Sequence, residues 1–367
     1  MIPGPIEFEP EVMMAVGAPT TSHVAPDFIE SFGHALEMMR EVWLAPSGQP
    51  FIMAGSGTLA MDMAGANLVE PGDRVLVIST GYFGDRYAEL LRRYGAEVTV
   101  LQAPVGETVT PAAVEAELQR TRYRLMTFTH VDTSTAVRVD PEPLGALGEK
   151  YGVITVLDGV CSVAGEVIRQ DEWKIDVVLT ASQKAVGVPP GLALLVASPK
   201  AMEAWKNRKA PVGSYYSDWT HWLPVMKAYE ERRPAYFGTP AVNLVSGLEV
   251  SLRLILKEGM EARFRRHKER GAAFREAMRD LGLRMIPVSE EVCANTLSAP
   301  YYPEGMKGAD FMKSIASSDV ILAGGLLPGI KESYFRVGHM GSVTEGDIIT
   351  TVAAVRNALS ACGYSKK

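Results

Sequence analysis

The sequence predicts an α/β protein: a large domain with a mostly parallel sheet of the seven-stranded type, flanked by helices, and then a smaller C-terminal α+β domain. Three observations predict this class. Short apolar runs occur in the first half of the chain, helical stretches separate them, and three weaker strands followed by a last helix lie near the end. Strands of a parallel sheet are buried on both faces, so they are apolar throughout rather than alternating.

The apolar runs of the first half are rich in Val, Ile and Leu and lie at residues 51–54, 75–78, 98–100, 125–128, 153–157 and 177–179. The helical stretches between them cover residues 87–94, 111–120 and 141–151. Pro111 and Pro141 suit the first turn of a helix, where a missing N–H costs nothing. Residues 191–197 predict a further strand, of the antiparallel kind that mixed sheets often carry.

The second half of the chain is less regular. Residues 209–238 are rich in Tyr, Trp and Pro, which predicts a long ordered excursion at a functional site or an interface. A helical region spans residues 241–281, with a break at 257–259. The smaller domain is predicted by three weaker strands and a last helix, at residues 295–299, 320–323, 334–337 and 344–359.

Composition excludes several classes of protein. The formal net charge of −6 argues against a nucleic-acid binder that relies on overall basic charge. No apolar stretch approaches the roughly 20 residues that a membrane span needs, and the first residues do not resemble a signal peptide. Three cysteines without a CxxC pair and six histidines without metal-ligand spacing predict no disulfide framework and no metal site. We therefore expect a cytoplasmic enzyme without a membrane or nucleic-acid partner.

Chemically active side chains follow the ends of several predicted strands. Asp158 comes directly after one strand, and Lys184 follows the next. A glycine-rich helix start, residues 55–58, follows the first strand, and Phe83 lies behind another. Because ligands of open α/β sheets bind at the carboxyl ends of the strands, we expect these residues to lie along one rim.

This set of residues fits pyridoxal phosphate. The aldehyde of that cofactor needs a lysine amine, here Lys184, and its pyridine nitrogen stays protonated only beside a carboxylate, here Asp158. Its phosphate suits a helix N-terminus with free N–H groups, which Ser56, Gly57 and Thr58 would supply. Its flat ring suits an aromatic neighbour, and Phe83 is the candidate.

Other interpretations of the same residues stay open on sequence grounds. Each residue alone is more often a turn, a cap, a solvated lysine or a core aromatic. Residues 55–60 also fit the dinucleotide fingerprint G-x-G-x-x-A, but the next strand ends without the acidic residue that holds the ribose. A non-catalytic protein that kept the fold is a further alternative, and the presence of both Lys184 and Asp158 argues against it.

Further motifs extend over nearly the whole chain: Pro3-Gly4-Pro5, Ser22-His23, Gly81-Tyr82-Phe83-Gly84, His130-Val131-Asp132-Thr133-Ser134-Thr135, Ser182-Gln183-Lys184, Tyr236-Phe237-Gly238-Thr239-Pro240 and Phe335-Arg336-Val337-Gly338. With these motifs the chain resembles the class V, fold-type I aminotransferases. Within that class it is most similar to the alanine–glyoxylate and serine–glyoxylate (serine–pyruvate) group.

The resemblance implies a role in cofactor binding for each matching residue. Lys184 would form the internal aldimine and carry the proton, and Asp158 would hold the pyridinium N–H. Phe83 would stack on the ring and Val160 would pack on its opposite face. Thr133 would bond the phenolate oxygen. The phosphate would be held by Ser56, Gly57, Thr58 and Gln183.

The resemblance also implies a homodimer with shared active sites, in which Tyr236 and Thr239 reach the neighbouring subunit's cofactor phosphate. Thr239 before Pro240 also suits a helix start. Arg336 would bind the substrate carboxylate, helped by the backbone N–H of Gly4. A planar guanidinium pairs with a carboxylate through two parallel hydrogen bonds, which supports that assignment independently.

The implied reaction is transamination between a small amino acid, alanine or serine, and a 2-oxo acid, glyoxylate or pyruvate. Residues 1–20 would contribute to the substrate site, residues 21–256 would form the large cofactor-binding domain, and residues 257–367 the small domain. Alternatives within the class are a pyridoxamine–pyruvate or aminophosphonate transaminase and a cysteine desulfurase-like lyase, for which Cys293 would be the nucleophile. The family usually has Glu where this chain has Asp132.

Overall fold

The computed structural model describes residues 1–364, and its centre is a seven-stranded sheet in the order β1-β9-β8-β7-β4-β2-β3. The strands are β1 (Gln49–Ala54), β2 (Arg74–Ser79), β3 (Glu97–Gln102), β4 (Leu125–Thr129), β7 (Ile154–Asp158), β8 (Val177–Ala181) and β9 (Leu192–Ala197). The five strands from β8 to β3 are parallel, and β9 is antiparallel to both of its neighbours. The mostly parallel sheet and the antiparallel strand near residue 191 are therefore confirmed.

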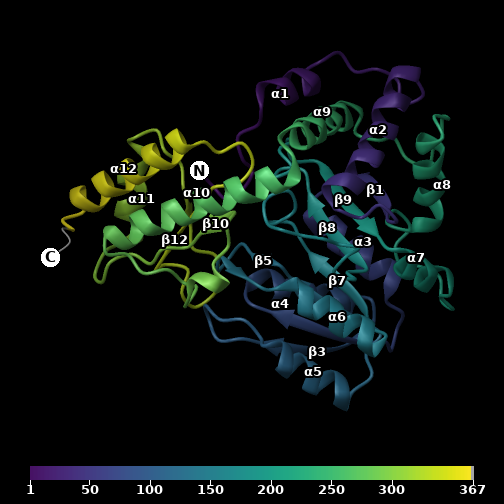
Figure 1. The fold of residues 1–367 in the computed structure, drawn as a ribbon, viewed down its shortest axis with the longest axis horizontal. Helices are drawn as coiled ribbons and strands as arrows, with labels where there is room; N and C mark the ends of the chain where they lie inside the picture. Colours follow the sequence, from purple (N-terminus) through teal and green to yellow (C-terminus); the bar gives the residue numbers. More distant parts are fainter. Residues whose placement is uncertain (365–367) are drawn as a thin grey trace.

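Helices flank this sheet, and α1 packs on α9 outside it (Figure 1). They are α1 (Pro10–Val16), α2 (Pro26–Val42), α3 (Gly57–Leu68), α4 (Tyr82–Arg93), α5 (Pro111–Arg120), α6 (Pro141–Tyr151), α7 (Pro199–Lys206), α8 (Trp219–Glu230) and α9 (Val242–Glu258). Pro111 and Pro141 occupy first turns as expected, with Thr110 and Asp140 as side-chain caps. Helix α3 follows the end of β1 and α4 follows the end of β2, so both helices begin at the carboxyl edge of the sheet.

The C-terminal part of the chain has its own hydrophobic cluster and a three-stranded antiparallel sheet in the order β10-β12-β11 (Figure 1). Its elements are α10 (Met260–Asp280), the 3-10 helix η1 (Glu290–Val292), β10 (Leu297–Ser298), α11 (Gly308–Ala316), β11 (Ala323–Gly324), β12 (Phe335–Gly338) and α12 (Glu345–Ala361). The N-terminus lies here too, since the Met1 ammonium donates to Ile321 O at 2.9 Å. The expected domain limits stay a prediction, and residues 365–367 lie outside the described residues.

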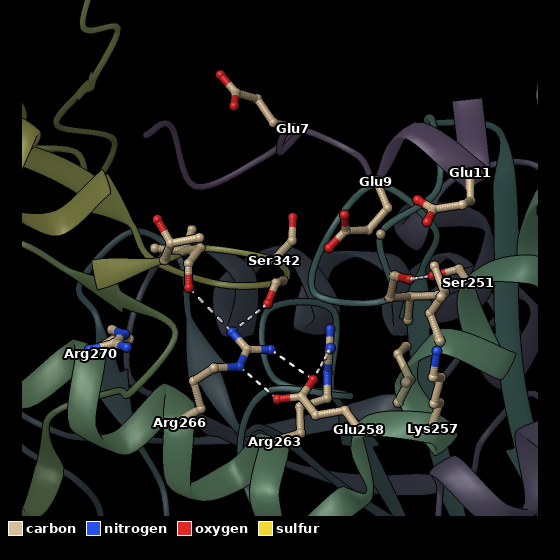
Figure 2. A pocket seen from close by; sticks show the side chains of 17 residues that line it. Glu7, Glu9, Glu11, Ser251, Lys257, Glu258, Arg263, Arg266, Arg270 and Ser342 are labelled. Carbon is tan, nitrogen blue, oxygen red and sulfur yellow. Dashed lines mark hydrogen bonds and ion pairs between the residues drawn. The ribbon is translucent and has the colours of Figure 1, made fainter. Parts of the chain in front are cut away.

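The long helical region is broken where the sequence predicts, at Gly259 between α9 and α10. A cavity of about 570 Å³ lies at this junction (Figure 2). Glu258 accepts from Arg266 Nε at 2.6 Å and from Arg263 Nη1 at 2.8 Å. Arg266 also donates to Gly341 O at 2.9 Å, so one ion-paired cluster joins the helix break to the segment between β12 and α12.

Three expectations are wrong in detail. The excursion at residues 209–238 contains helix α8, whose period is obscured by Pro224 inside it and by its aromatic residues. Helix α9 begins at Val242 with Ala241 as its N-cap, so Thr239 does not cap it. The strand expected at residues 320–323 is instead Ala323–Gly324, because pairing with β12 reaches only those two residues. Within residues 1–364, no helix combines the length and the apolar character needed to cross a bilayer.

Candidate active site

Three strands that run in the same direction, β7, β8 and β1, deliver the central residues to one edge of the sheet. Asp158 is the last residue of β7 and pairs in register with Thr129 of β4 and Leu179 of β8. Lys184 follows the end of β8 after two residues. Residues 56–58 follow β1, which runs in the same direction as β8 because both are antiparallel to β9. The carboxyl edge therefore collects an acid, an amine and a helix N-terminus.

Asp158 is a buried carboxyl group with few polar neighbours. Oδ1 accepts from Val160 N at 3.1 Å, and Oδ2 accepts a long hydrogen bond of 3.4 Å from Thr129 Oγ1. Burial is the main cause that raises the pKa of Asp158 from 3.8 to about 6, and the charge of Asp132 adds to the effect. This carboxyl group is suited to a cationic partner that would hold it ionised.

Lys184 lies against the N-terminal segment. Its Nζ donates to Pro3 O, and a Cβ on Gly4 would lie only 2.7 Å from Nζ. Gly4 has a φ of +115°, which L side chains rarely adopt, so a glycine is required here for two reasons. Ile6 N donates to Gln183 O at 3.2 Å and fixes the segment beside the lysine.

The start of helix α3 is open for a ligand. Ser56 is its N-cap but makes no side-chain capping bond, and both Ser56 and Thr58 are exposed. A Cβ on Gly57 would lie 2.7 Å from Val160 Cγ2, so only glycine allows the helix start to approach the Asp158–Val160 turn this closely. Gln183 Oε1 is buried without a hydrogen-bond partner. Free N–H groups, hydroxyls and an unpaired amide thus lie close to the acid and the lysine.

Arg336 belongs to the C-terminal sheet but reaches the large sheet. Its Nη1 donates to Thr133 O at 3.1 Å and its Nε to Gly324 O at 2.8 Å. Burial lowers the pKa of this guanidinium. Thr133 follows the carboxyl end of β4, the strand whose Thr129 pairs with Asp158. Arg336 therefore reaches the edge of the sheet that carries Asp158 and Lys184.

Phe83 is held by a residue for which the sequence assigned no role. Asp132 Oδ2 accepts from Phe83 N at 2.9 Å and from Gly84 N at 3.3 Å, while Oδ1 accepts from Ser134 N at 2.8 Å. The carboxylate thus caps the first turn of α4 from strand β5 (Val131–Asp132), which pairs with β6 (Val137–Arg138). Its place in the His130–Thr135 motif was the only sequence signal for this role.

Two of the expected cofactor residues lie apart from the rest. Tyr236 is 65% exposed, and its ring is 5.4 Å from the ring of His23. Thr239 is also exposed. No hydrogen bond within residues 1–364 joins either residue to Lys184 or Asp158, so their assignment to a neighbouring subunit stays a prediction.

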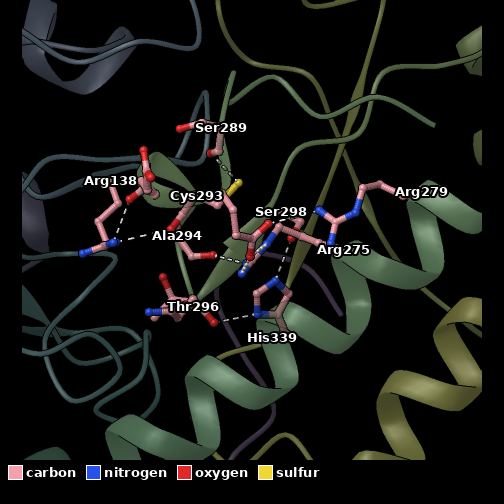
Figure 3. Close-up of polar contacts among 12 residues, drawn as sticks. Arg138, Arg275, Arg279, Ser289, Cys293, Ala294, Thr296, Ser298 and His339 are labelled. Carbon is pink, nitrogen blue, oxygen red and sulfur yellow. Dashed lines mark hydrogen bonds and ion pairs between the residues drawn. The ribbon is translucent and has the colours of Figure 1, made fainter.

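The cysteine expected for a lyase is not placed as a mobile nucleophile. Cys293 is 4% exposed and follows η1, and its Sγ donates to Ser289 O at 3.3 Å (Figure 3). Its carbonyl accepts from Arg138 Nε at 3.3 Å. Burial raises the pKa of the Cys293 thiol, which disfavours the reactive thiolate.

These features fit pyridoxal phosphate. The buried carboxyl group of Asp158 suits a pyridinium N–H, the uncapped start of α3 with its close-fitting Gly57 suits a phosphate, and Lys184 is the amine that an aldehyde requires. A dinucleotide enzyme would instead need an acid at the end of β2, where the chain has Ser79.

Comparison with known proteins gives the family. The family model for class V aminotransferases matches residues 11–329, and the chain belongs to this family. An alanine–glyoxylate aminotransferase of Saccharomyces cerevisiae is 38% identical over 93% of this chain and 91% of its own. The crystal structure of an alanine–glyoxylate aminotransferase from Nostoc sp. superposes with a TM-score of 0.92 at 30% identity, over 98% and 94% of the two chains. That of pyridoxamine–pyruvate aminotransferase from Mesorhizobium loti also gives 0.92, at 26% identity over 99% and 92%.

The chain is therefore a pyridoxal-phosphate-dependent aminotransferase of fold type I. The predicted class, cofactor and fold are confirmed at this level.

Proposed function

We propose that this enzyme exchanges the amino group of a small amino acid, alanine or serine, with a small 2-oxo acid, glyoxylate or pyruvate. The single observation that carries the proposal is that Lys184, Asp158 and Arg336 meet at one edge of the sheet, where they offer an amine, a buried carboxyl group and a guanidinium to one ligand. The similarity to the alanine–glyoxylate enzymes of yeast and Nostoc supports this choice of substrates.

In this proposal Arg336 orients the substrate by its carboxylate. Nε and one Nη1 proton are used by backbone carbonyls, and within residues 1–364 the Nη2 group donates no hydrogen bond to the chain. The remaining Nη1 and Nη2 protons can therefore donate two parallel hydrogen bonds to a substrate carboxylate, in an orientation that the two backbone carbonyls fix. The Gly4 N–H assists from the N-terminal segment.

Lys184 holds the cofactor before substrate arrives and then moves the proton at the substrate Cα. The bound cofactor supplies the electron sink for that proton transfer. In the bound state Asp158 would keep the ring nitrogen protonated and Thr133 would bond the ring oxygen. Phe83 and Val160 would lie on opposite faces of the ring, and Ser56, Gly57, Thr58 and Gln183 would hold the phosphate.

We also propose a homodimer in which Tyr236 and Thr239 complete the neighbouring subunit's site. The support is their exposure within an aromatic surface formed by Tyr215, Tyr236 and Phe237. Exposed aromatic groups of this kind are enriched at protein interfaces.

We further propose the domain limits at residues 20 and 256. We also propose a reducing, cytoplasmic location, consistent with three free cysteines.

Pyridoxamine is a second candidate donor, favoured by the similarity to the Mesorhizobium loti enzyme. Because pyridoxamine has no carboxylate, its half-reaction would not need Arg336, whereas an amino-acid donor would. The two candidates thus differ in their dependence on one residue.

The experiment is a matrix of donors and acceptors, assayed with wild type, Lys184→Ala and Arg336→Ala. We expect alanine or serine with glyoxylate or pyruvate to give the highest kcat/KM. Lys184→Ala should lose all activities. In single-turnover measurements of the donor half-reaction alone, Arg336→Ala should lose reaction with carboxylate donors and keep reaction with pyridoxamine. Absence of activity with every amino acid would refute the proposal, and activity with pyridoxamine alone would favour the second candidate.

A further inference from the structure

Tyr334 is a buried residue beside Arg336 to which no role has been assigned. It directly precedes β12, and its side chain has 0% exposure. Its Oη accepts from Leu326 N and from Leu327 N, each at 2.8 Å, and donates to Ser134 O at 2.5 Å. One hydroxyl therefore joins three backbone groups from two distant segments.

Arg336 joins the same two segments. It donates to Gly324 O in one segment and to Thr133 O in the other. In an extended strand residues two apart lie on one face, so Tyr334 and Arg336 lie side by side. Phe335 and Val337, on the opposite face, pack in the hydrophobic cluster of the C-terminal part.

The loop at residues 324–327 fits closely over Tyr334. A Cβ on Gly325 would lie 2.6 Å from Tyr334 Cε1, so the backbone of the loop passes directly across the ring. The buried hydroxyl accepts hydrogen bonds from two N–H groups that would otherwise lack partners. Leaving these groups without a partner would destabilise the loop. The loop conformation therefore depends on this one oxygen.

We propose that Tyr334 is a positioning residue for substrate binding: it fixes the 324–327 loop against Thr133 and Ser134, and so presets the guanidinium of Arg336 for the substrate carboxylate. The inference rests on the proposed role of Arg336. Without the hydroxyl, the segment directly after Gly324 loses two hydrogen bonds, and the Gly324 carbonyl that orients Arg336 Nε stands at the end of β11 with that segment no longer fixed. The substrate must then order that loop on binding, which costs affinity.

The test compares Tyr334→Phe with Tyr301→Phe. The Tyr301 ring lies 6.4 Å from that of Tyr334, and its hydroxyl makes no hydrogen bond within the described residues 1–364, so it is a matched control. We expect Tyr334→Phe to raise KM for carboxylate substrates about tenfold while kcat changes less than about threefold, because ordering is lost but no reacting group is. Tyr301→Phe should leave both constants unchanged.

A second measurement does not depend on activity. Amide hydrogen exchange of Leu326 and Leu327 should be slow in wild type and in Tyr301→Phe, and at least about tenfold faster in Tyr334→Phe. If Tyr334→Phe does not fold, fast exchange of these two amides in wild type overturns the inference and slow exchange supports it. If wild type is active and Tyr334→Phe has the same KM and the same amide exchange as wild type, the inference about Tyr334 is overturned and the proposed function is not. An inactive wild type overturns the proposed function, and the exchange data still decide the role of Tyr334.

Discussion

Replacing Asp158 by Asn should stabilise the cofactor-free protein at neutral pH while removing most of the activity of the loaded enzyme. The carboxyl group is buried, and within residues 1–364 it accepts hydrogen bonds only from Val160 N and Thr129 Oγ1. An asparagine keeps both contacts, since its oxygen accepts from Val160 and its amide can donate to Thr129. Only the charge is lost, and in the absence of the cofactor that charge is unfavourable.

The magnitude follows from the pKa of Asp158, which burial raises from 3.8 to about 6. Between these pH values the folded state binds a proton that the unfolded state does not, so the free energy of unfolding falls as pH rises. This decrease in the free energy of unfolding is complete above about pH 6. It amounts to about 3 kcal/mol, from roughly two pKa units at about 1.4 kcal/mol each. Asparagine has no such dependence, so the variant should gain stability above pH 6 and none near pH 4.

Denaturation of cofactor-free wild type and variant at pH 4 and pH 8 measures this difference. Asp176→Asn is a contrasting control, because Asp176 pairs with Lys200 at 3.0 Å and accepts from Thr155 N at 2.9 Å. That variant should be less stable than wild type at pH 8. If Asp158→Asn is also less stable than wild type at pH 8, the argument from burial is refuted.

Three further predictions follow from the site. Asp132→Asn should lose about 1–3 kcal/mol of stability and weaken cofactor binding, measured by denaturation and titration, and Asp132→Glu should retain more of both. Gly4→Ala should lower kcat at least about tenfold without lowering the melting temperature much, because its methyl group would contact Lys184 Nζ; an unchanged kcat would contradict the placement of the N-terminal segment. Mixing Lys184→Ala subunits with Tyr236→Phe/Thr239→Ala subunits should restore activity above either parent, and a mixture no better than its parents after confirmed subunit exchange would argue against shared sites.

Sequence alone could predict which residues lie along the carboxyl edge of the sheet, because that placement depends only on neighbouring residues in the chain. Each buried strand is a continuous apolar run, and the residue after it is fixed at the carboxyl edge, as Asp158 is at the end of β7. The antiparallel strand β9 and the helix break at Gly259 were predictable for the same reason. Helix α8 was not, because Pro224 and its aromatic residues obscure the helical period.

The residues that position the site could not be predicted, because their contacts join distant segments. Asp132 accepts from an amide 49 positions away, and Tyr334 donates to a carbonyl 200 positions away. In the sequence, Asp132 can be interpreted as an acidic residue in a turn and Tyr334 as an aromatic residue at the start of a strand, so neither residue indicates a role at the site. His130, from the same motif as Asp132, is buried, and neither of its ring nitrogens has a hydrogen-bond partner within residues 1–364.

The central claim is that Lys184 carries the cofactor, and reductive trapping tests it most directly. The purified enzyme loaded with pyridoxal phosphate is treated with borohydride, digested, and mapped by mass spectrometry. The account predicts loss of the visible absorbance band and a single modified peptide, labelled at Lys184. It further predicts no stable label in Lys184→Ala. A label on another lysine, or an unlabelled Lys184 in active enzyme, would contradict it.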